Sequence, residues 1–451
     1  MLSMCISIAR FIYRIATRLA STGSSNNRTV LPQELIDYTL DFLQDDVPTL
    51  RKCILVARSF VPSSRFHIYS QISLTNSNSH SASRLVQSFR QEHVGRVYTC
   101  RKLHRLLTEF PDIPSLVTTF GIFGSDPTGL CDLCDDPIIL SIIPNLCFLK
   151  RIALVQLDRS TAWWSLNVNF KSCFLQVLRL PGLTTLHINN VYMSEASEFM
   201  VLFDSVALSV KNLVLDQAYT QPISSNYSLP PFQREVPILE SLEICNFTSD
   251  NGFALMLKSP PFFFNLHHLR RLAVQDRTCS ANGMMQALLD VTVHTLEHLL
   301  IQLDKCPGKN FKLYVCALSL THPEASDLPL NLCRHERLAS IHVVVIIWDS
   351  KILNLKSLTY PPTMRNLTVD AIFGAFRHLA RRMGVPDCRT LDACIDQLHL
   401  PSLQSVRVRV HNARHHECQN WYCGELPAGL FEPGWKLEIE RGQIFDSLIV
   451  T

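Results

Sequence analysis

The chain has 451 residues, of which 47% are hydrophobic and 18% are charged, and its formal net charge is +3. This length exceeds one ordinary globular domain, so we expect two or more units or one repetitive array. The charge is too evenly balanced for general nucleic-acid binding, which depends on an excess of positive charge. No run approaches the ~20 apolar residues that cross a bilayer. We therefore predict no nucleic-acid partner and no membrane span.

Sixteen cysteines are scattered along the chain, from Cys5 to Cys423. Their density is below that of a disulfide-stabilised scaffold, and free thiols are readily buried as small apolar groups. This usage indicates a reduced intracellular protein, cytoplasmic or nuclear.

Residues 1–28 contain no acidic residue, and Arg10, Arg14 and Arg18 recur every four residues. Apolar residues lie elsewhere around the same helix: Ile8, Ile12, Ile15 and Leu19. We interpret 1–28 as a leader that is disordered or forms an amphipathic helix. The alternative is a mitochondrial transit peptide, because such peptides are rich in Arg and Ser and poor in acids.

The stretch LPQELIDYTLDFL (31–43) predicts a short amphipathic helix. Pro32 suits a first helical turn, and apolar residues then recur at helical spacing. A second apolar series begins at Leu50 and breaks at Pro62, and a strand-like Gln71–Leu74 follows. Two or three short helices bury too little surface to be stable alone. We expect residues 29–74 to form a helical domain that packs on the rest of the chain or on a partner.

Beyond residue 75 the pattern L-x-x-L-x-L returns with conservative substitutions, and successive starts lie 26 to 42 residues apart. The copies begin at Val117, Leu149, Leu183, Val210, Leu239, Leu269, Leu296, Leu338, Met364 and Leu403. Each copy reads as a strand with alternate residues pointing inward, followed by a return segment. The pattern predicts an α/β fold: a short N-terminal three-helix unit, an irregular leucine-rich-repeat-like solenoid over 75–410, and a C-terminal cap over 411–451.

Motifs for nucleotide, hydrolase and metalloprotease chemistry are absent from the sequence. Cys131-x2-Cys134 has the spacing of half a zinc site. No second pair lies nearby, and His415, His416, Cys418 and Cys423, which could in principle supply it, are about 280 residues away. We predict no enzyme activity, no cofactor and no metal site.

Residues 31–74 resemble an F-box of the form typical of fungal F-box-like proteins. The resemblance rests on Leu31-Pro32 with Glu34-Leu35-Ile36, on Phe42-Leu43, and on Val56 with Arg58-Ser59-Phe60. It implies a substrate receptor of a Skp-cullin-F-box type ubiquitin ligase. The helices would bind a Skp-type adaptor and through it a cullin, and the C-terminal array would bind an unknown protein substrate.

The resemblance also implies which residues contact the adaptor: Leu31, Pro32, Leu35, Ile36, Leu40 and Leu43, with Val56 and Phe60 near the junction. Phe60 stands where the family often has Trp, and Thr39 where an aliphatic residue is usual. The sequence leaves two alternatives open. In one, the helices cap a repeat scaffold that has no role in ubiquitin transfer. In the other, residues 1–28 direct import into an organelle.

Overall fold

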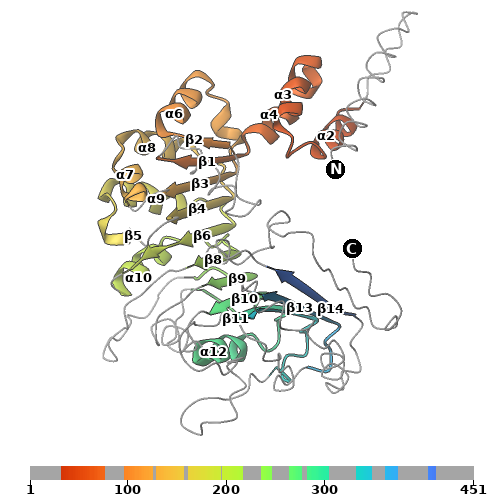
Figure 1. Ribbon diagram of the computed structural model, residues 1–451. Coiled ribbons are helices and arrows are strands. Elements are labelled where there is room, and N and C mark those ends of the chain that lie inside the picture. The colour runs from red at the N-terminus through yellow and green to blue at the C-terminus, as the bar shows by residue number, and fades with distance from the viewer. Residues whose placement is uncertain are drawn as a thin grey trace, which may run out of the picture.

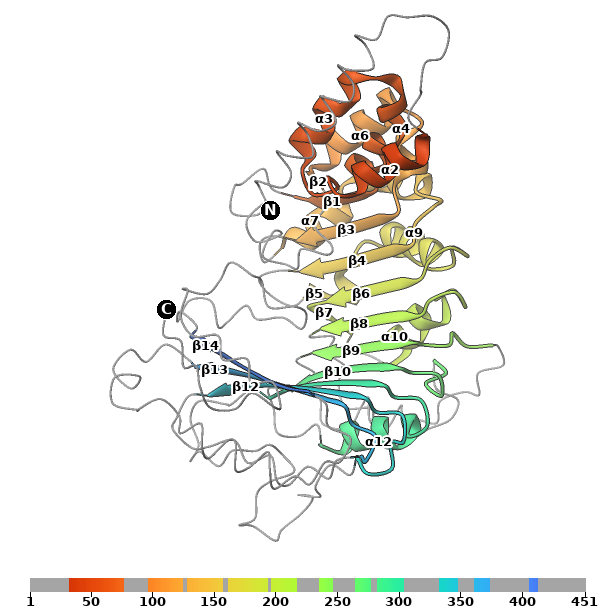
Figure 2. The same ribbon diagram turned by 90° about the vertical axis from the view of Figure 1, so that its right-hand side faces the viewer.

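The computed structural model describes residues 32–76, 96–124, 128–156, 161–193, 196–216, 235–245, 264–276, 282–303, 332–347, 361–373 and 405–412. These residues form one large open sheet of twelve parallel strands, in the order β14-β13-β12-β11-β10-β9-β8-β6-β4-β3-β1-β2. Helices cover one face of the sheet, and three further helices lie beyond its β1 and β2 end (Figures 1 and 2).

The strands are short and follow one another in chain order, apart from the first two. Their bounds are β1 Gln71–Thr75, β2 Arg96–Tyr98, β3 Thr119–Gly124, β4 Arg151–Gln156, β6 Thr185–Asn189, β8 Asn212–Asp216, β9 Ser241–Cys245, β10 Arg271–Asp276, β11 His298–Leu303, β12 Ser340–Ile347, β13 Asn366–Phe373 and β14 Ser405–Asn412. A separate parallel pair joins β5 (Thr161–Ala162) to β7 (Val191–Tyr192).

The prediction of a three-helix unit followed by an irregular solenoid is wrong. The structure is an α/β arrangement around a single open parallel sheet. The strand at the end of the predicted helical domain, β1, pairs with β3 on one side and with β2 on the other. The helical segment and the array therefore share one sheet. The sequence pattern locates strands, but it does not show that the strand after the helices pairs with the later ones.

The ten L-x-x-L-x-L copies coincide with strands β3, β4, β6 and β8–β14. The second residue of each motif pairs in register with its counterpart in the next strand, as Ile152 does with Leu186 and Leu186 with Leu213. Alternate strand residues point to the same face. Ile152, Leu154 and Leu186 are consequently buried in the core cluster that extends along the sheet.

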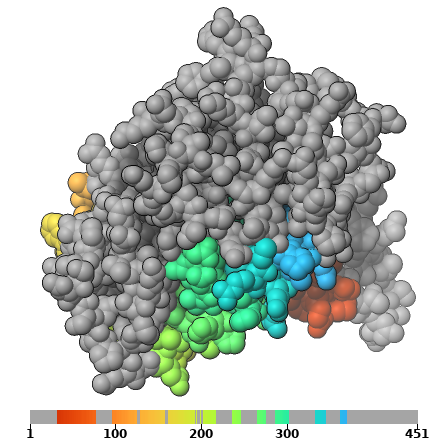
Figure 3. Space-filling model, turned by 90° about the horizontal axis from the view of Figure 1, so that it is seen from below, coloured from red at the N-terminus to blue at the C-terminus, as the bar shows by residue number. Residues whose placement is uncertain are grey.

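The covering helices supply the other half of this core. They are α6 Cys100–Glu109, α7 Gly129–Asp135, α8 Pro137–Ile142, α9 Val168–Leu178, α10 Ala196–Asp204 and α12 Asn282–Thr292. Phe170 and Phe174 of α9 are fully buried and stack with ring centroids 5.9 Å apart. Seen from below, segments between about residues 200 and 373 follow one another in chain order at the surface (Figure 3). Stacking of successive strand and helix segments thus buries apolar faces that no single segment could bury alone.

A repeated hydrogen bond fixes where strands begin. The backbone N–H groups of Lys150 and Arg151 both donate to the carbonyl of Thr118, at 2.8 and 3.0 Å, and those of Thr184 and Thr185 both donate to the carbonyl of Lys150. The same arrangement recurs as far as β13. Each strand start is therefore set by the strand before it, which explains the constant register.

Buried polar groups lie at the carboxyl ends of the central strands, opposite the ends at which the strands begin. Asn189 donates from its side-chain amide to Asp216 at 2.5 Å, and the side-chain amide of Asn190 donates to the carbonyl of Gln156 at 2.8 Å. Asn190 has a φ of 53°, a left-handed conformation that Asn tolerates better than most residues. These bonds compensate for the cost of burying amide and carboxyl groups.

Several predicted features lie outside the described residues: the leader 1–28, Leu31, and the C-terminal cap beyond residue 412. In the described part of the chain, no helix has the length and apolar character needed to cross a membrane.

Candidate protein-docking site

Helix α2 (Gln33–Asp41) begins after Pro32, which serves as its N-cap residue. Glu34 lies in the first turn, where a negative charge is favourable beside the free N–H groups. Ile36 and Leu40 are buried, and Leu43 follows one turn later, so one face of α2 packs inward. The local sequence thus builds the helix that the apolar spacing predicts.

The inward face belongs to a small core that α2 shares with α3 (Val47–Val56), the short 3₁₀ helix η1 (Arg58–Phe60) and α4 (Val61–Tyr69). Its buried members are Ile36, Leu40, Leu43, Leu50, Phe60 and Ile68. Asp46 caps α3 by accepting a hydrogen bond from the backbone of Thr49 at 3.1 Å. Pro62 lies in the first turn of α4. These helices, α2–α4 with η1, are called the helical unit below.

A second apolar face of α2 is exposed. Leu35, Tyr38 and Phe42 have 52%, 62% and 51% of their surface accessible, and they follow i, i+3, i+7 spacing. The rings of Tyr38 and Phe42 meet edge to face with centroids 4.9 Å apart. Neighbouring residues at this spacing form one continuous strip. We call Leu35 and Tyr38 of α2, together with its C-cap residue Phe42, the α2 stripe.

Further exposed apolar side chains belong to the other helices of the unit. Leu55 and Val56 end α3, with 85% and 56% of their surface accessible, and Phe66 on α4 is also exposed. Single exposed apolar residues are ordinary on protein surfaces. Six of them within 32 residues, three on one helix strip, indicate a surface that another protein can bury.

Carboxylates accompany the α2 stripe. Glu34, Asp41 and Asp45 are exposed, and residues 29–50 contain five acidic residues and no Lys or Arg. Glu34 and Asp41, seven residues apart, lie along one flank of the stripe. The surface is therefore apolar along its centre and negative along that side.

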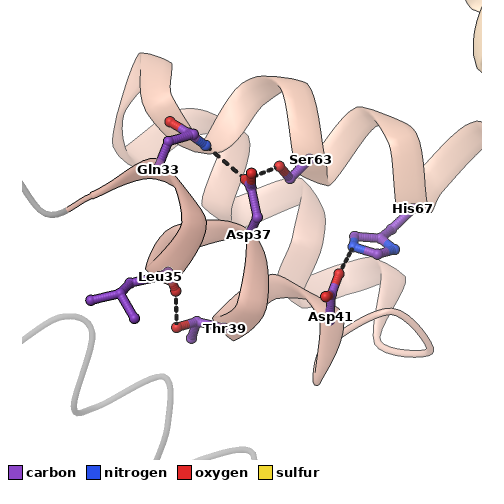
Figure 4. Close-up of polar contacts among 7 residues, drawn as sticks. All are labelled: Gln33, Leu35, Asp37, Thr39, Asp41, Ser63 and His67. Carbon is purple, nitrogen blue, oxygen red and sulfur yellow. Dashed lines mark hydrogen bonds and ion pairs between the residues drawn. The ribbon is translucent and has the colours of Figure 1, made fainter.

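Two polar contacts hold α2 against α4 (Figure 4). The hydroxyl of Ser63 donates to the carboxylate of Asp37, which also accepts a hydrogen bond from Gln33 at 2.7 Å. One turn further on, His67 Nε2 lies 2.9 Å from Asp41 Oδ1. The bonds from Ser63 and Gln33 stabilise the ionised carboxylate, and they lower the pKa of Asp37. The contacts orient α2 and so determine which of its faces points outward.

The structure distributes the sequence-predicted adaptor residues over two environments. Pro32, Leu35 and Val56 are exposed. Four others are buried within the helical unit: Ile36, Leu40, Leu43 and Phe60. The remaining one, Leu31, lies outside the described residues. Pro32 and Leu35 are brought together at the start of α2, whereas the buried four support the unit from inside.

The two departures from the family pattern have clear positions. Phe60 is only 8% exposed and fills the core of the helical unit, so its ring is not displayed. Thr39 donates its hydroxyl to the carbonyl of Leu35 at 2.6 Å. This bond satisfies the polar group of Thr39 on its own helix.

Sequence reasoning missed Tyr38 and Phe42 as members of the exposed face. The available signal was the second set of apolar residues at i, i+3 and i+7, interleaved with Ile36, Leu40 and Leu43. A short helix that is apolar on two faces cannot bury both against one small core. One face is then left exposed.

The helical unit is joined to the sheet through α4 and β1. The ring of Tyr69 packs against both hydrophobic cores and lies 5.2 Å below the guanidinium of Arg96. Arg65 forms an ion pair with Asp112 at 2.6 Å. The carbonyl of Ser70 accepts hydrogen bonds from the backbone of Thr118 and Thr119. The helical unit is thus anchored to the sheet by several different contacts.

The Cys131-x2-Cys134 pair lies on α7. Cys134 is buried, which raises the pKa of its thiol, and Cys131 Sγ is 3.5 Å from the hydroxyl of Ser165. A thiol that stays protonated is a poor metal ligand. Among the described residues no group of three or more metal-binding side chains was found, and His415, His416, Cys418 and Cys423 lie outside them.

Comparison of the chain with protein-family models gave no match, and comparison with curated proteins found no relative.

Proposed function

We propose that this protein is a substrate receptor of a Skp-cullin-F-box type ubiquitin ligase. In this proposal the helical unit binds a Skp-type adaptor, and the parallel sheet with its helices binds a protein substrate. The observation that carries the proposal is the α2 stripe, formed by Leu35, Tyr38 and Phe42 on the segment that resembles an F-box. The chain would act by holding its substrate near the ubiquitin-transfer machinery, and no bond-making step is assigned to it.

The stripe has the properties of a helix-in-groove ligand. Such helices present apolar anchors at i, i+3 and i+7 to a groove on the partner. An aromatic side chain buries about 150–250 Å² on docking, at about 25 cal/mol for each Å². Two aromatic residues and one leucine are enough to supply a central group of strong contacts. Tyr38 in addition carries a hydroxyl that can remain at the rim of such a groove.

Adaptor binding should be tested with the full-length chain. Wild-type protein, co-expressed with a Skp-type adaptor, is expected to retain the adaptor on purification. Leu35→Asp combined with Phe42→Asp should weaken retention at least about 30-fold, because each change places a charge in a desolvated contact. Both side chains are exposed, so neither change disrupts the core.

Phe148→Asp is the matched control, since Phe148 is 62% exposed and lies in the sheet region, just before β4. This variant should retain the adaptor like wild type. The proposal fails if wild type retains no adaptor, or if the Leu35 and Phe42 variant retains as much as the Phe148 variant. Leu40 is unsuitable for this experiment, because it is fully buried and a charge there would unfold the helical unit.

A second candidate function is a scaffold for protein binding without a role in ubiquitin transfer. The observation that favours it is the position of β1, which lies between β2 and β3 in the sheet and follows α4 directly. Tyr69 also buries part of the helical unit against the main core. A segment attached in this way can serve as the end cap of the sheet. Deletions that end on either side of β1 separate the two roles.

A further inference from the structure

We infer that the α2 stripe of one molecule binds a second copy of this chain, on the turns that precede strands β4, β6, β8 and β9. The exposed large apolar side chains of these turns are Phe148, Leu208 and Ile238, and we call them the turn ridge. The contact itself does not depend on the proposed function. One consequence does rest on it, which is that a Skp-type adaptor and a second copy of the chain compete for the stripe.

The turn ridge follows from the repeat. A two-residue turn lies four and three positions before the first residue of β4, β6 and β8: Cys147-Phe148, Pro181-Gly182 and Leu208-Ser209. Ile238 lies three positions before β9. The strands are paired in register, so their turns succeed one another at about 4.8 Å, and Phe148 and Ile238 are about 14 Å apart along the edge of the sheet.

Hydrogen bonds fix neighbouring turns to one another. The hydroxyl of Ser209 donates to the carbonyl of Leu183 at 2.7 Å, which joins the turn of β8 to the start of β6. The hydroxyl of Thr184 donates to the carbonyl of Lys150 at 3.0 Å and so joins β6 to β4. The ridge is therefore a preformed surface, and little conformational entropy is lost when it binds.

The turn ridge and the α2 stripe are alike in apolar character and in length. Phe148, Leu208 and Ile238 are 62%, 52% and 47% exposed. The stripe from Leu35 to Phe42 is about 10 Å long, at 1.5 Å for each residue. Since the side chains of both surfaces are exposed in the single chain, the two surfaces do not cover each other within one molecule. A contact between them therefore joins two molecules.

The charges beside the two surfaces have opposite signs. Lys150 and Arg151 are exposed directly after the turn of β4, and Arg179 is exposed before the turn of β6. Neither Lys150 nor Arg151 forms an ion pair with another residue in the described ranges. The α2 stripe is accompanied by the exposed carboxylates of Glu34 and Asp45. Opposite charges around an apolar contact fix its register and favour encounter of the two surfaces.

Positive charge is concentrated at the β4 end of the ridge. Residues 137–194 contain five Lys or Arg and one acidic residue. At the β9 end, Lys211 is paired with Glu240 at 2.7 Å, and Glu235 is exposed as well. The hydrogen bond from Lys211 lowers the pKa of Glu240, which keeps this pair ionised and mutually compensated. The charge gradient along the ridge favours one orientation of a bound α2.

Each molecule carries one stripe and one ridge, so the contact joins two different surfaces. A reciprocal pair of such contacts closes into a two-fold dimer, and a contact that is not reciprocated extends into longer assemblies. Three apolar side chains on each side make a small interface, so the association should be weak, with a Kd of roughly 10 μM.

The experiment tests complementary variants of the full-length chain, without any adaptor. The stripe variant carries Leu35→Asp with Phe42→Asp, and the ridge variant carries Leu208→Asp with Ile238→Asp. All four side chains are exposed, so the changes leave the core intact. Sedimentation velocity over about 1–100 μM should show self-association of wild type, and each variant alone should associate at least about tenfold more weakly. A mixture of the two variants should form a one-to-one complex, because one supplies an intact ridge and the other an intact stripe.

Charge reversal tests the electrostatic argument separately. Lys150→Glu with Arg151→Glu should weaken self-association at least about tenfold, because carboxylates would then face carboxylates. Glu34→Lys with Asp45→Lys, added to these two changes, should restore it toward the wild-type value. Trp164→Asp is the matched control, since Trp164 is 61% exposed and belongs to neither surface, and this variant should associate like wild type.

Three results would overturn the inference: wild type that stays monomeric throughout the concentration series, a mixture of stripe and ridge variants that does not associate, or a charge reversal that the Lys changes do not rescue. Failure of any of them leaves the adaptor proposal standing, because no adaptor is present in these experiments. Failure of adaptor retention, in turn, leaves a measured self-association valid. The ridge variant separates the two further, since it should retain the adaptor but lose self-association.

Discussion

The hydroxyl of Ser63 on α4 donates a hydrogen bond to the carboxylate of Asp37 on α2. Four residues further along each helix, Asp41 and His67 meet in the same way. These two contacts lie on the side of α2 that faces α4, whereas Leu35 points away from it (Figure 4). The polar pairs therefore control the orientation of an apolar surface to which they do not contribute.

Loss of the Ser63 contact should loosen α2 without unfolding the sheet. Ser63→Ala removes one donor to Asp37, and we expect a loss of about 0.5–1.5 kcal/mol in local stability. Ser63→Asp should cost more, because it places a second carboxylate beside Asp37. Hydrogen exchange of the α2 amides measures the effect, which should appear as faster exchange in both variants and fastest in Ser63→Asp.

Amides of β3 and β4 provide the control for this exchange experiment, since they lie in the sheet and should exchange at wild-type rates. Equal exchange of α2 in wild type, Ser63→Ala and Ser63→Asp would show that the core alone orients the helix. The buried face formed by Ile36 and Leu40 would then be sufficient.

Two leucines of α3 should differ sharply in their contribution to stability. Leu50 is fully buried in the core of the helical unit, and Leu55 is 85% exposed. Leu50→Ala is expected to cost about 2–5 kcal/mol, because it removes buried surface and leaves a cavity. Leu55→Ala should change stability by less than about 0.5 kcal/mol. Urea unfolding of the two variants measures both values, and a similar loss in each would contradict the described packing.

The sequence contains enough information to locate the strands, because the alternation of apolar residues within each L-x-x-L-x-L motif is a local pattern. The motif beginning at Leu149, for example, predicts β4 in its observed place. The order of pairing is not a local property. Whether Ile72 would pair with Phe120 depends on contacts between residues far apart in the chain, and the prediction of a three-helix unit followed by a solenoid failed for this reason.

For the candidate site, too, local spacing in the sequence is informative, whereas long-range packing cannot be deduced from it. Apolar spacing identifies α2, but it cannot say which of its two apolar faces packs inward. Leu35 and Ile36 are neighbours in the chain, and only the arrangement of α3 and α4 makes one exposed and the other buried. Phe60 illustrates the consequence, because family resemblance suggests contact with a partner whereas packing places its ring inside.

Deletion across the junction should distinguish a docking unit from a cap of the sheet. Removal of residues 1–69 keeps β1, and removal of residues 1–75 also takes the strand that pairs with both β2 and β3. If the helical unit is a docking module, the shorter deletion should remain folded and monomeric. The longer deletion exposes the edge of β3 and should aggregate. Light scattering and thermal unfolding measure both outcomes.

A cap gives a different result in the same pair of deletions. Loss of Tyr69 would uncover part of the main core, and the 1–69 deletion would then aggregate as readily as the 1–75 deletion. A matched substitution, Tyr69→Phe, keeps the ring in both cores and should behave like wild type. Tyr69→Ala should cost about 3–5 kcal/mol if the ring joins the two parts.

His335 should make stability depend on pH. Its ring is 1% exposed, and Nε2 lies 3.0 Å from the carbonyl of Leu289 on α12. Burial lowers the pKa of His335 below its ordinary value of 6.5, with a further small effect in the same direction from the charge of Arg334. The bond to Leu289 and the charge of Asp290 act in the opposite direction but do not outweigh burial.

The sign of this pH effect follows from which state binds the proton. Above about pH 6.5 the imidazole is neutral in the folded and unfolded chains, so stability does not depend on it. Below that value the unfolded chain takes up a proton more readily than the folded chain, and stability falls by at most about 1.4 kcal/mol for each pH unit. His335→Gln cannot titrate and should lose less stability than wild type between pH 7.5 and pH 5.5. Urea unfolding at both pH values measures the difference, and an equal loss in the two proteins would show that His335 does not contribute.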